Sequence, residues 1–365
     1  MTDPGRRRRV VVVGLDHYHV AGWVETLELF PEQLEIVALY DPSPERARDL
    51  RPRYSDPSLA QVLPDRYRSL PVESDLGALL ERHAPDVALV TLPNRDAPAA
   101  IARLGGAGVH LVVDKPAALS AAAAGAAFRA ARAGGARVVV GLTRHYTPAW
   151  LAARAAIAGG ALGTFIGAEA VFAASTVGVR GVDNPLFDAG LMGGGILSWL
   201  GIHELDALLW LTGDPVVEVQ AMSGRIGAPG LAVEDVISVG LRFASGAIAT
   251  LAESFSLAAR GYRGGMALRG TAGSVELPPD GTLVTVTPDP ATPFLREARQ
   301  AFPEDVVPGY GAGGRAAVAD LLAAIDEGRD PVVTGDDLVR ALVLVDAAYR
   351  SAREGRVIRT DEIAR

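Results

Sequence analysis

The first 145 residues alternate short apolar runs, mostly β-branched, with segments of helical periodicity. Residues 9–14 form the first run, which ends in Gly14, as is typical of a strand buried on both faces of a parallel sheet. Because a strand–helix–strand unit brings the chain back parallel to its first strand, the alternation predicts a doubly wound α/β sheet. We expect the other strands at 34–40, 86–92, 109–113 and 137–141, and helices at 20–29, at 43–50, between the third strand and Gly105, and in the Ala-rich stretch 117–136.

The pattern changes after residue 145. Turn-forming residues such as Ala244-Ser245-Gly246 separate long strand candidates and predict hairpins. We therefore expect an α+β domain, residues 146–365, whose mostly antiparallel open sheet has helices on one face and whose terminal helices can pack back on the domain of residues 1–145. Its strands are expected at 164–174, 216–225, 233–243, 247–256, 265–270 and 274–277, its helices at 148–158, 193–211, 315–327 and 336–354, and a long Pro- and Gly-rich loop at 278–314.

Composition narrows the classes of function. The chain has no cysteine, which excludes disulfides, thiolate metal sites and a cysteine nucleophile. A formal net charge of −8 argues against nucleic acid or an acidic membrane surface as the main partner. The apolar run after Arg6–Arg9 spans residues 10–13, which is shorter than the about 7–15 residues of a signal peptide's apolar region. We therefore expect a cytoplasmic protein that does not span a membrane.

Lys115 is the single lysine of the chain, although lysine and arginine together number 35. A sequence this biased toward arginine has replaced nearly every surface ammonium by a guanidinium. Lysine differs from arginine in being a compact charge whose pKa can shift far enough for proton transfer. The retained lysine is therefore a candidate functional residue, although chance can also leave one lysine anywhere.

A strand that runs into Gly14 and then into a helix is where dinucleotide-binding folds hold pyrophosphate. The glycine fingerprint is degenerate, since Asp16 and His19 occupy its second and third glycine positions, and a carboxylate would repel phosphate unless it turns away to cap the helix. Asp41 ends the second strand, where a carboxylate accepts hydrogen bonds from a ribose 2′-hydroxyl and favours NAD over NADP. Asp41 can equally be a turn residue before Pro42.

Asp16, His17 and His19 can also be considered as a metal cluster. Residues 17 and 19 point the same way in an extended loop. The sequence offers no obvious third ligand, however, and the position is where a phosphate would lie. We therefore predict no metal.

Three stretches resemble one known family. Val90-Thr-Leu-Pro-Asn94 and Gly108 through Asp114-Lys115-Pro116 are similar to the Glu-Lys-Pro region of the glucose–fructose oxidoreductase/inositol dehydrogenase (Gfo/Idh/MocA) family. The glycine triplet at 193–195, followed by His203-Glu-Leu-Asp206, resembles that family's glycine-triplet helix with its His-x-x-Asp. Residues 334–355 look like the family's last helix. These motifs occur in the family's order, so the resemblance spans nearly the whole chain.

The resemblance implies an N-terminal Rossmann domain and an NAD(P)-dependent oxidoreductase that acts on a sugar, a polyol or a related carbonyl compound. Lys115 matches the family lysine that lies near the nicotinamide and contacts the reacting oxygen. His203 matches the family's catalytic histidine. Oxidising a secondary alcohol requires a base for the hydroxyl proton while hydride leaves, and an ammonium can stabilise the developing alkoxide.

The predicted site therefore has two catalytic residues and two binding regions. Lys115 and His203 are the catalytic candidates. The predicted cofactor residues, for NAD with NADP as a possibility, are Gly14, Asp16, His17, His19, Asp41, Leu92, Pro93, Asn94, Asp114, Lys115 and Pro116. The predicted substrate residues are Arg144, Tyr146, Asn184, Trp199 and His203.

Several positions depart from the family pattern. Trp199 stands where many members have an aspartate four residues before the histidine, and i,i+4 spacing predicts that it lies beside His203. Ala97 replaces a frequent histidine, and Asp114 replaces the glutamate of Glu-Lys-Pro. Two alternatives consequently stay open: an NAD-requiring glycoside-cleaving enzyme and a non-catalytic sensor. The family's open sheet also leads us to expect a homodimer or homotetramer.

Overall fold

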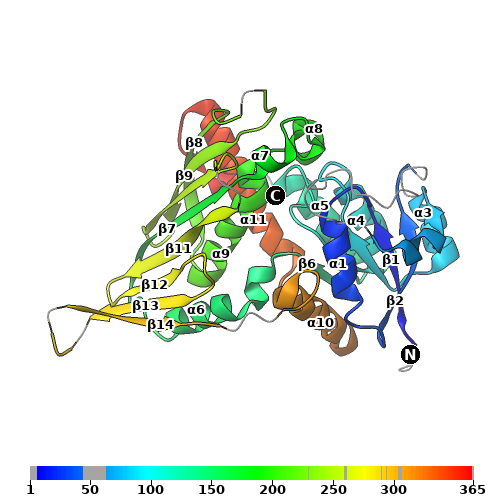
Figure 1. The fold of residues 1–365 in the computed structure, drawn as a ribbon, viewed down its shortest axis with the longest axis horizontal. Coiled ribbons are helices and arrows are strands. Elements are labelled where there is room, and N and C mark those ends of the chain that lie inside the picture. Colours follow the sequence, from blue (N-terminus) through cyan, green and yellow to red (C-terminus); the bar gives the residue numbers. More distant parts are fainter. Residues whose placement is uncertain are drawn as a thin grey trace.

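The computed structural model describes residues 6–43, 63–228, 230–258, 261–288, 290–292, 294–302 and 306–363. Two sheets dominate it (Figure 1). The first is a six-stranded parallel sheet in the order β3-β2-β1-β4-β5-β6, which confirms the predicted doubly wound fold. Its strands are β1 (Arg8–Val13), β2 (Leu34–Tyr40), β3 (Val72–Glu73), β4 (Val87–Val90), β5 (His110–Val113) and β6 (Val138–Val140).

Helices cover both faces of this sheet. The strands can be apolar throughout because both faces are buried, and Val10, Val11, Val12 and Val13 of β1 are 0% exposed. The helices that connect the strands are α1 (His19–Leu27), α3 (Leu76–His83), α4 (Ala97–Gly106) and α5 (Ala121–Ala133). The helix predicted at 43–50 lies outside the described residues.

The second sheet has nine strands in the order β14-β13-β12-β11-β7-β10-β9-β8-β15. Its neighbouring strands are antiparallel except for β7 and β10, which run parallel. The mostly antiparallel sheet is therefore confirmed. Its strands are β7 (Phe165–Ala174), β8 (Val216–Gly224), β9 (Val236–Phe243), β10 (Ile248–Ser254), β11 (Tyr262–Gly270), β12 (Ser274–Leu277), β13 (Leu283–Pro288), β14 (Leu295–Gln300) and β15 (Ile358–Arg359).

Helices α6 (Pro148–Ala158), α9 (Ile202–Thr212) and α11 (Gly335–Glu354) lie between the nine-stranded sheet and the parallel sheet (Figure 1). Helix α10 (Gly311–Glu327) packs on α1 and β6, while α11 packs on α5 and also on β8. The terminal helices therefore return to the first sheet and join the two halves. Short helices complete this part: η2 (Thr143–Tyr146), α7 (Thr176–Arg180), η3 (Pro185–Phe187) and α8 (Ala189–Met192).

Two predictions about this half are wrong in detail. The segment predicted as a long loop at 278–314 contains β13 and β14, which pair as a hairpin, and the start of α10. Of its described prolines, Pro288 ends β13, and Pro279, Pro290 and Pro308 lie in turns, where they do not interrupt the ladder. The helix predicted from residue 193 begins after the glycine triplet, at residue 196. A Cβ on Gly195 would lie 1.8 Å from the carbonyl oxygen of Glu234, so this position requires glycine.

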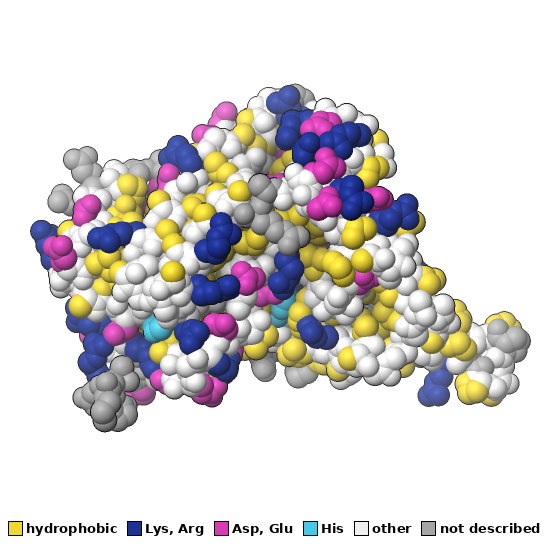
Figure 2. All heavy atoms as spheres, turned by 180° about the vertical axis from the view of Figure 1, so that it is seen from behind, with side chains coloured by type: hydrophobic (Ala, Val, Ile, Leu, Met, Phe, Trp, Pro, Cys, Tyr) yellow, Lys and Arg dark blue, Asp and Glu magenta, His cyan; other side chains and the backbone are white. Residues whose placement is uncertain are grey.

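On the face seen in Figure 2, basic, acidic and hydrophobic side chains are interspersed. Phe294 and Leu295 at that hairpin are 74% and 71% exposed. Within the described ranges, no helix is both long enough and apolar enough to cross a membrane.

Candidate active site

Two loops at the carboxyl edge of the parallel sheet begin the site. The chain leaves β1 at Gly14 and β5 at Asp114, and open α/β sheets bind their ligands at this edge. Gly14 has a φ of +98°, and a Cβ at this position would lie 2.7 Å from the backbone nitrogen of Leu92. Glycine is therefore required for the β1–α1 loop to pass so close to the loop after β4.

A cavity of about 100 Å³ opens beside Gly14. Asp41, at the end of β2, is 1% exposed, and its carboxylate accepts a 2.7 Å hydrogen bond from the backbone nitrogen of Ser43. A buried carboxylate next to a glycine turn fits the ribose end of NAD. The cavity brings together five of the predicted cofactor residues, since it is lined by Gly14, Leu15, Asp16, Asp41, Pro42, Leu92, Pro93, Arg95, Asp96 and Leu191.

A second group of predicted cofactor residues meets around Asp114. Its carboxylate lies 2.8 Å from Nδ1 of His19 and accepts a 3.2 Å hydrogen bond from the indole of Trp23. Burial alone would raise the pKa of Asp114, but His19, His17 and Lys115 lower it below its usual value. Burial lowers the pKa of His19, partly offset by Asp114, and lowers that of His17 further. The carboxylate is therefore ionised and both imidazoles are neutral at pH 7.

Lys115 is buried between the two halves of the molecule. Its side chain is 5% exposed, and its ammonium donates a hydrogen bond to the backbone carbonyl of Trp199 and lies 5.5 Å from the centre of that indole ring. Burial lowers the pKa of Lys115 to about 8, against the opposing effects of Asp114 and Glu204. Pro116, joined to it by a cis peptide bond, is also buried.

A π-helical turn (η4, Leu197–Gly201) precedes α9 and positions His203. Such turns occur frequently at functional sites. Burial lowers the pKa of His203 well below its usual value, and Lys115, Arg144 and His19 lower it further. His203 is therefore near the groups around Lys115 and Asp114. The π-turn alters the spacing assumed for Trp199, whose ring stacks on His17 at 5.3 Å.

Several buried polar atoms near Lys115 have no hydrogen-bond partner among the described residues. Arg144 bonds to Glu204 at 2.5 Å, yet Nη1 of the arginine and Oε2 of the glutamate have no partner in the described ranges. The same holds, within those ranges, for both carboxyl oxygens of Glu253 on β10 and for Nε1 of Trp199. Burial raises the pKa of Glu204, and burial and the neighbouring Glu204 raise that of Glu253 well above its usual value. We call Arg144, Glu204 and Glu253 the polar cluster; its unpartnered atoms and the indole nitrogen of Trp199 are donors and acceptors that no described residue uses.

Sequence reasoning missed Glu204 and Glu253. Glu204 is adjacent to His203 and ordinary in a helix, so nothing marked it. Glu253 lies on the same buried face of β10 as Ala249 and Leu251, so a charged residue in an inward position was the available signal.

Three of the predicted cofactor and substrate residues make hydrogen bonds elsewhere in the protein. The hydroxyl of Tyr146 donates to Asp320 on α10 at 2.8 Å. The side-chain oxygen of Asn184 accepts from the backbone nitrogen of Leu186 within its own turn. The amide of Asn94 donates to the carbonyl of Met192, which ties the loop after β4 to α8. The structure thus does not bring Tyr146 or Asn184 to Lys115 by any hydrogen bond recorded for the described residues.

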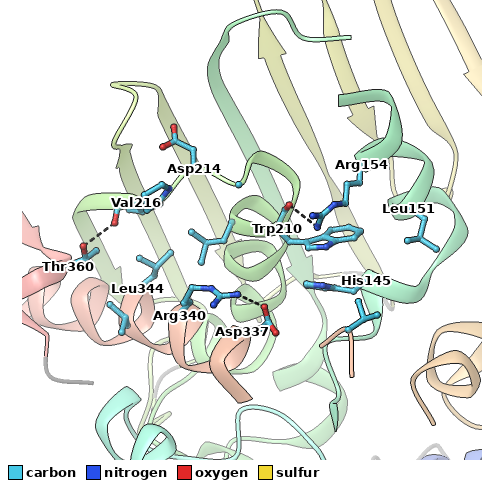
Figure 3. A pocket seen from close by; sticks show the side chains of 15 residues that line it. His145, Leu151, Arg154, Trp210, Asp214, Val216, Asp337, Arg340, Leu344 and Thr360 are labelled. Atoms are coloured by element: carbon cyan, nitrogen blue, oxygen red, sulfur yellow. Dashed lines mark hydrogen bonds and ion pairs between the residues drawn. The ribbon is translucent and has the colours of Figure 1, made fainter. Parts of the chain in front are cut away.

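A larger cavity of about 730 Å³ lies between α6, α9 and α11 (Figure 3). His145 and Arg154 lie on opposite sides of Trp210, with ring-centre and guanidinium distances of 4.4 and 4.8 Å. The imidazole of His145 is paired with Asp206 at 2.8 Å. Neither Lys115 nor His203 is among the residues that line this cavity, so it is separate from the site around Lys115.

The fold and this site define a dinucleotide-dependent oxidoreductase with a substrate half built on a second sheet. Residues 8–142 match the oxidoreductase family with an NAD-binding Rossmann fold, and residues 150–276 match the GFO/IDH/MocA C-terminal domain. The chain belongs to the Gfo/Idh/MocA family of oxidoreductases. The predicted family, fold and NAD cofactor are therefore confirmed.

Individual relatives agree with this assignment. Inositol 2-dehydrogenase of Rhizobium meliloti (strain 1021) is 29% identical over 280 residues, which cover 75% of this chain and 80% of that protein. The 1,5-anhydro-D-fructose reductase of Ensifer adhaerens is 30% identical over 257 residues, 68% of this chain and 72% of that protein. Aldose–aldose oxidoreductase from Caulobacter crescentus has the same fold, with a TM-score of 0.76 at 24% identity over 97% of this chain and all of that one.

Proposed function

We propose that this oxidoreductase transfers hydride between NAD and a secondary alcohol or ketone of a sugar or polyol, with Lys115 and His203 as its catalytic residues. The observation that carries the proposal is the burial of Lys115 between the halves, beside both His203 and the polar cluster. Two relatives whose names denote action on inositol and 1,5-anhydro-D-fructose support the substrate class.

Different residues of the chain would bind the cofactor, accept the proton and stabilise the developing charge. NAD, when bound, supplies the hydride acceptor. His203 takes the hydroxyl proton while the carbon loses hydride, and Lys115 stabilises the developing negative charge on the oxygen. The hydrogen bond from Lys115 to the carbonyl of Trp199 fixes the ammonium in place. Gly14 and Asp41 would hold the ribose end.

The polar cluster suits a ligand with several hydroxyl groups. A hydroxyl both donates and accepts hydrogen bonds. A ligand with several hydroxyl groups can therefore accept from the Arg144 nitrogen and donate to the oxygens of Glu204 and Glu253 that have no partner among the described residues. An apolar substrate would leave all these atoms unsatisfied, at a cost of about 1–3 kcal/mol each. The cluster therefore favours a polyhydroxylated substrate.

The proposal extends to assembly and location. Ile166, Val171 and Ile248 are exposed apolar residues on the adjacent strands β7 and β10. Such a patch supports a homodimer or homotetramer built on this sheet. We further infer a cytoplasmic enzyme, in line with its dependence on a nicotinamide cofactor.

Calorimetric titration with NAD⁺, NADH, NADP⁺ and NADPH tests the proposal first, after denatured protein has been assayed for co-purified nucleotide. We expect NAD to bind more tightly than NADP, and a screen of sugar alcohols to find one that reduces NAD⁺. If none of the four nucleotides binds, the oxidoreductase proposal fails and the non-catalytic sensor is the alternative that stays open. A glycoside that is cleaved only when NAD is present, without net NADH, would show the oxidation–elimination–reduction alternative.

A further inference from the structure

The helical segment that leads into α9 begins at residue 196, and the first four N–H groups at a helix start have no partner within the helix itself. Glu234, from the loop between β8 and β9, supplies acceptors for three of them. One carboxylate oxygen accepts from the backbone N–H of Gly195 at 2.8 Å and the other from that of Leu197 at 3.2 Å. The backbone carbonyl of Glu234 accepts from the N–H of Ile196 at 3.3 Å. A residue distant in sequence thereby caps this helix.

Tyr349, on α11, provides the fourth acceptor. Its hydroxyl oxygen accepts from the backbone N–H of Ser198 at 3.2 Å, and the hydroxyl donates to the carboxylate of Glu234 at 2.7 Å. The N–H of Trp199 then makes the first bond within the helix, to the carbonyl of Gly195 at 3.1 Å. Glu234 and Tyr349 together therefore satisfy all four N–H groups that the helix start leaves open.

The glycine triplet lets these two side chains reach the backbone. A Cβ on Gly194 would lie 2.1 Å from the hydroxyl oxygen of Tyr349, and one on Gly195 would lie 2.9 Å from the carboxyl carbon of Glu234. A side chain at either place would displace the acceptors from the helix start. The triplet, Glu234 and Tyr349 thus form one packed unit, although they come from three separate segments of the chain.

The capped segment leads directly to the carbonyl that holds the ammonium of Lys115. That ammonium donates to the carbonyl of Trp199, the residue after Ser198, and makes no other hydrogen bond to the described residues. The carbonyl belongs to the π-helical turn η4, which departs from α-helical geometry. Its direction therefore depends on how the start of the turn is anchored, and a displaced helix start would move the acceptor of the ammonium.

The carboxylate of Glu234 acts as an acceptor in each of these bonds. Burial raises the pKa of Glu234, and the hydrogen bonds from Tyr349, Gly195 and Leu197 oppose that rise. A glutamine of the same shape has one acceptor oxygen and an amide nitrogen that can only donate. Glu234→Gln would therefore turn a donor toward at least one of the three donors that now face the carboxylate.

We propose that Glu234 and Tyr349 are positioning residues of the reaction, which hold η4 so that the carbonyl of Trp199 fixes the ammonium of Lys115. The proposal deepens the proposed function and rests on it, because that function gives Lys115 its part in the chemistry. Both residues act through the backbone of residues 195–199 rather than by contact with the substrate.

The single lysine offers a direct test that needs neither substrate nor NAD. The full chain labelled with [ε-¹³C]lysine gives one lysine resonance, that of Lys115, whose chemical shift reports the environment of the ammonium. We expect Tyr349→Phe and Glu234→Gln each to shift this resonance at pH 7, whereas Tyr67→Phe should leave it in place. Tyr67 is the matched control, since its hydroxyl also donates to a glutamate, Glu28, but in the Rossmann half.

Kinetics with an identified substrate completes the test. Tyr349→Phe and Glu234→Gln should lower kcat about tenfold while the KM for NAD⁺ stays within about twofold, because a misplaced catalytic group slows the chemical step more than it weakens cofactor binding. Tyr67→Phe should keep the kcat of the wild type. Circular dichroism and melting identify a variant that fails to fold, and Tyr349→Phe, which removes one oxygen from a partly exposed side chain, decides if Glu234→Gln does.

The outcomes separate this proposal from the proposed function. A lysine resonance that is unchanged in folded Tyr349→Phe would overturn the positioning role, whatever activity the chain has. An unchanged kcat in an active chain whose resonance shifts would also overturn it. A resonance that shifts in a chain that binds no nucleotide would support the anchoring of the ammonium and overturn only the proposed function.

Discussion

Buried polar groups on the two sides of the interdomain junction differ in whether they have hydrogen-bond partners within the protein. On the Rossmann side, Asp41 accepts from a backbone nitrogen, and Asp114 is bonded to both His19 and Trp23. On the other side, Trp199, Glu204 and Glu253 keep buried atoms that have no partner among the described residues. Because buried polar groups are nearly always hydrogen-bonded, we infer that a bound ligand satisfies this second set. The carboxylates of the proposed cofactor side are thus hydrogen-bonded within the protein, whereas those of the proposed substrate side are left to a ligand.

Lys115 follows β5 of the parallel sheet but donates its hydrogen bond to Trp199 of the other half. We therefore expect its replacement to have the largest effect on activity. We expect Lys115→Met to lower kcat by about 100-fold or more, since removing one preorganised charge stabiliser typically has that effect. Lys115→Arg should lower kcat more than tenfold, because guanidinium is larger and does not lose its proton. Steady-state kinetics with the identified substrate measures both.

Arg132→Lys is the matched control for Lys115→Arg. Arg132 is exposed and pairs with Asp336 on the surface, so the exchange should leave kcat unchanged. Near-normal turnover in Lys115→Arg would remove Lys115 from the mechanism and with it the link between the two sides.

Replacing Asp41 tests whether the Rossmann side selects NAD over NADP. Asp41→Ser removes the carboxylate that would repel a 2′-phosphate. We expect the preference for NAD over NADP, measured as a ratio of dissociation constants, to fall about 10- to 100-fold, or about 1.4–2.7 kcal/mol. Asp96→Asn removes another carboxylate of the same cavity and should leave the ratio unchanged. Equal ratios in wild type and Asp41→Ser would make Asp41 a turn residue only.

The sequence predicted the Rossmann side of the junction better than the other side. Residues 9–14 and the other valine-rich runs predicted the parallel strands, because a strand buried on both faces has few alternatives. Gly14 and Asp41 were found because each stands directly at the end of such a strand, and Lys115 because it is the single lysine and matches the family lysine. Glu253 was not, since its role depends on β10 lying beside the start of α9, which only the three-dimensional arrangement provides. The β13–β14 hairpin was hidden by the prolines and glycines at its ends.

Contacts between distant segments set the same limit. Asp114 follows a different strand from the one before His19, so their hydrogen bond was not visible from either segment alone. Trp199 was placed by helical spacing, and the π-turn at η4 broke the regularity on which that spacing depends.

The pH dependence of stability tests whether Glu253, on the proposed substrate side, is buried in its protonated form. Its pKa is raised in the folded state, so the folded chain holds a proton that the unfolded chain releases above about pH 4.3. Stability is therefore lost as pH rises from there toward the folded pKa. Glu253→Gln keeps the shape without the ionisation, so at pH 8 its free energy of unfolding should exceed that of the wild type by about 1–2 kcal/mol, and the difference should shrink toward pH 5. Urea unfolding at several pH values measures this. Exposed Glu297→Gln should show no such trend.

Trp199→Phe should have the smallest effect and is the most specific probe of an unpartnered donor. Phenylalanine keeps an aromatic ring against His17 and Lys115 but lacks the indole N–H. If that N–H binds a substrate hydroxyl, its loss removes one neutral hydrogen bond of about 0.5–1.5 kcal/mol, which corresponds to a severalfold rise in KM with little change in kcat. An unchanged KM would mean that the indole nitrogen stays unpartnered in the complex, and that the substrate is held by Arg144 and the two glutamates alone.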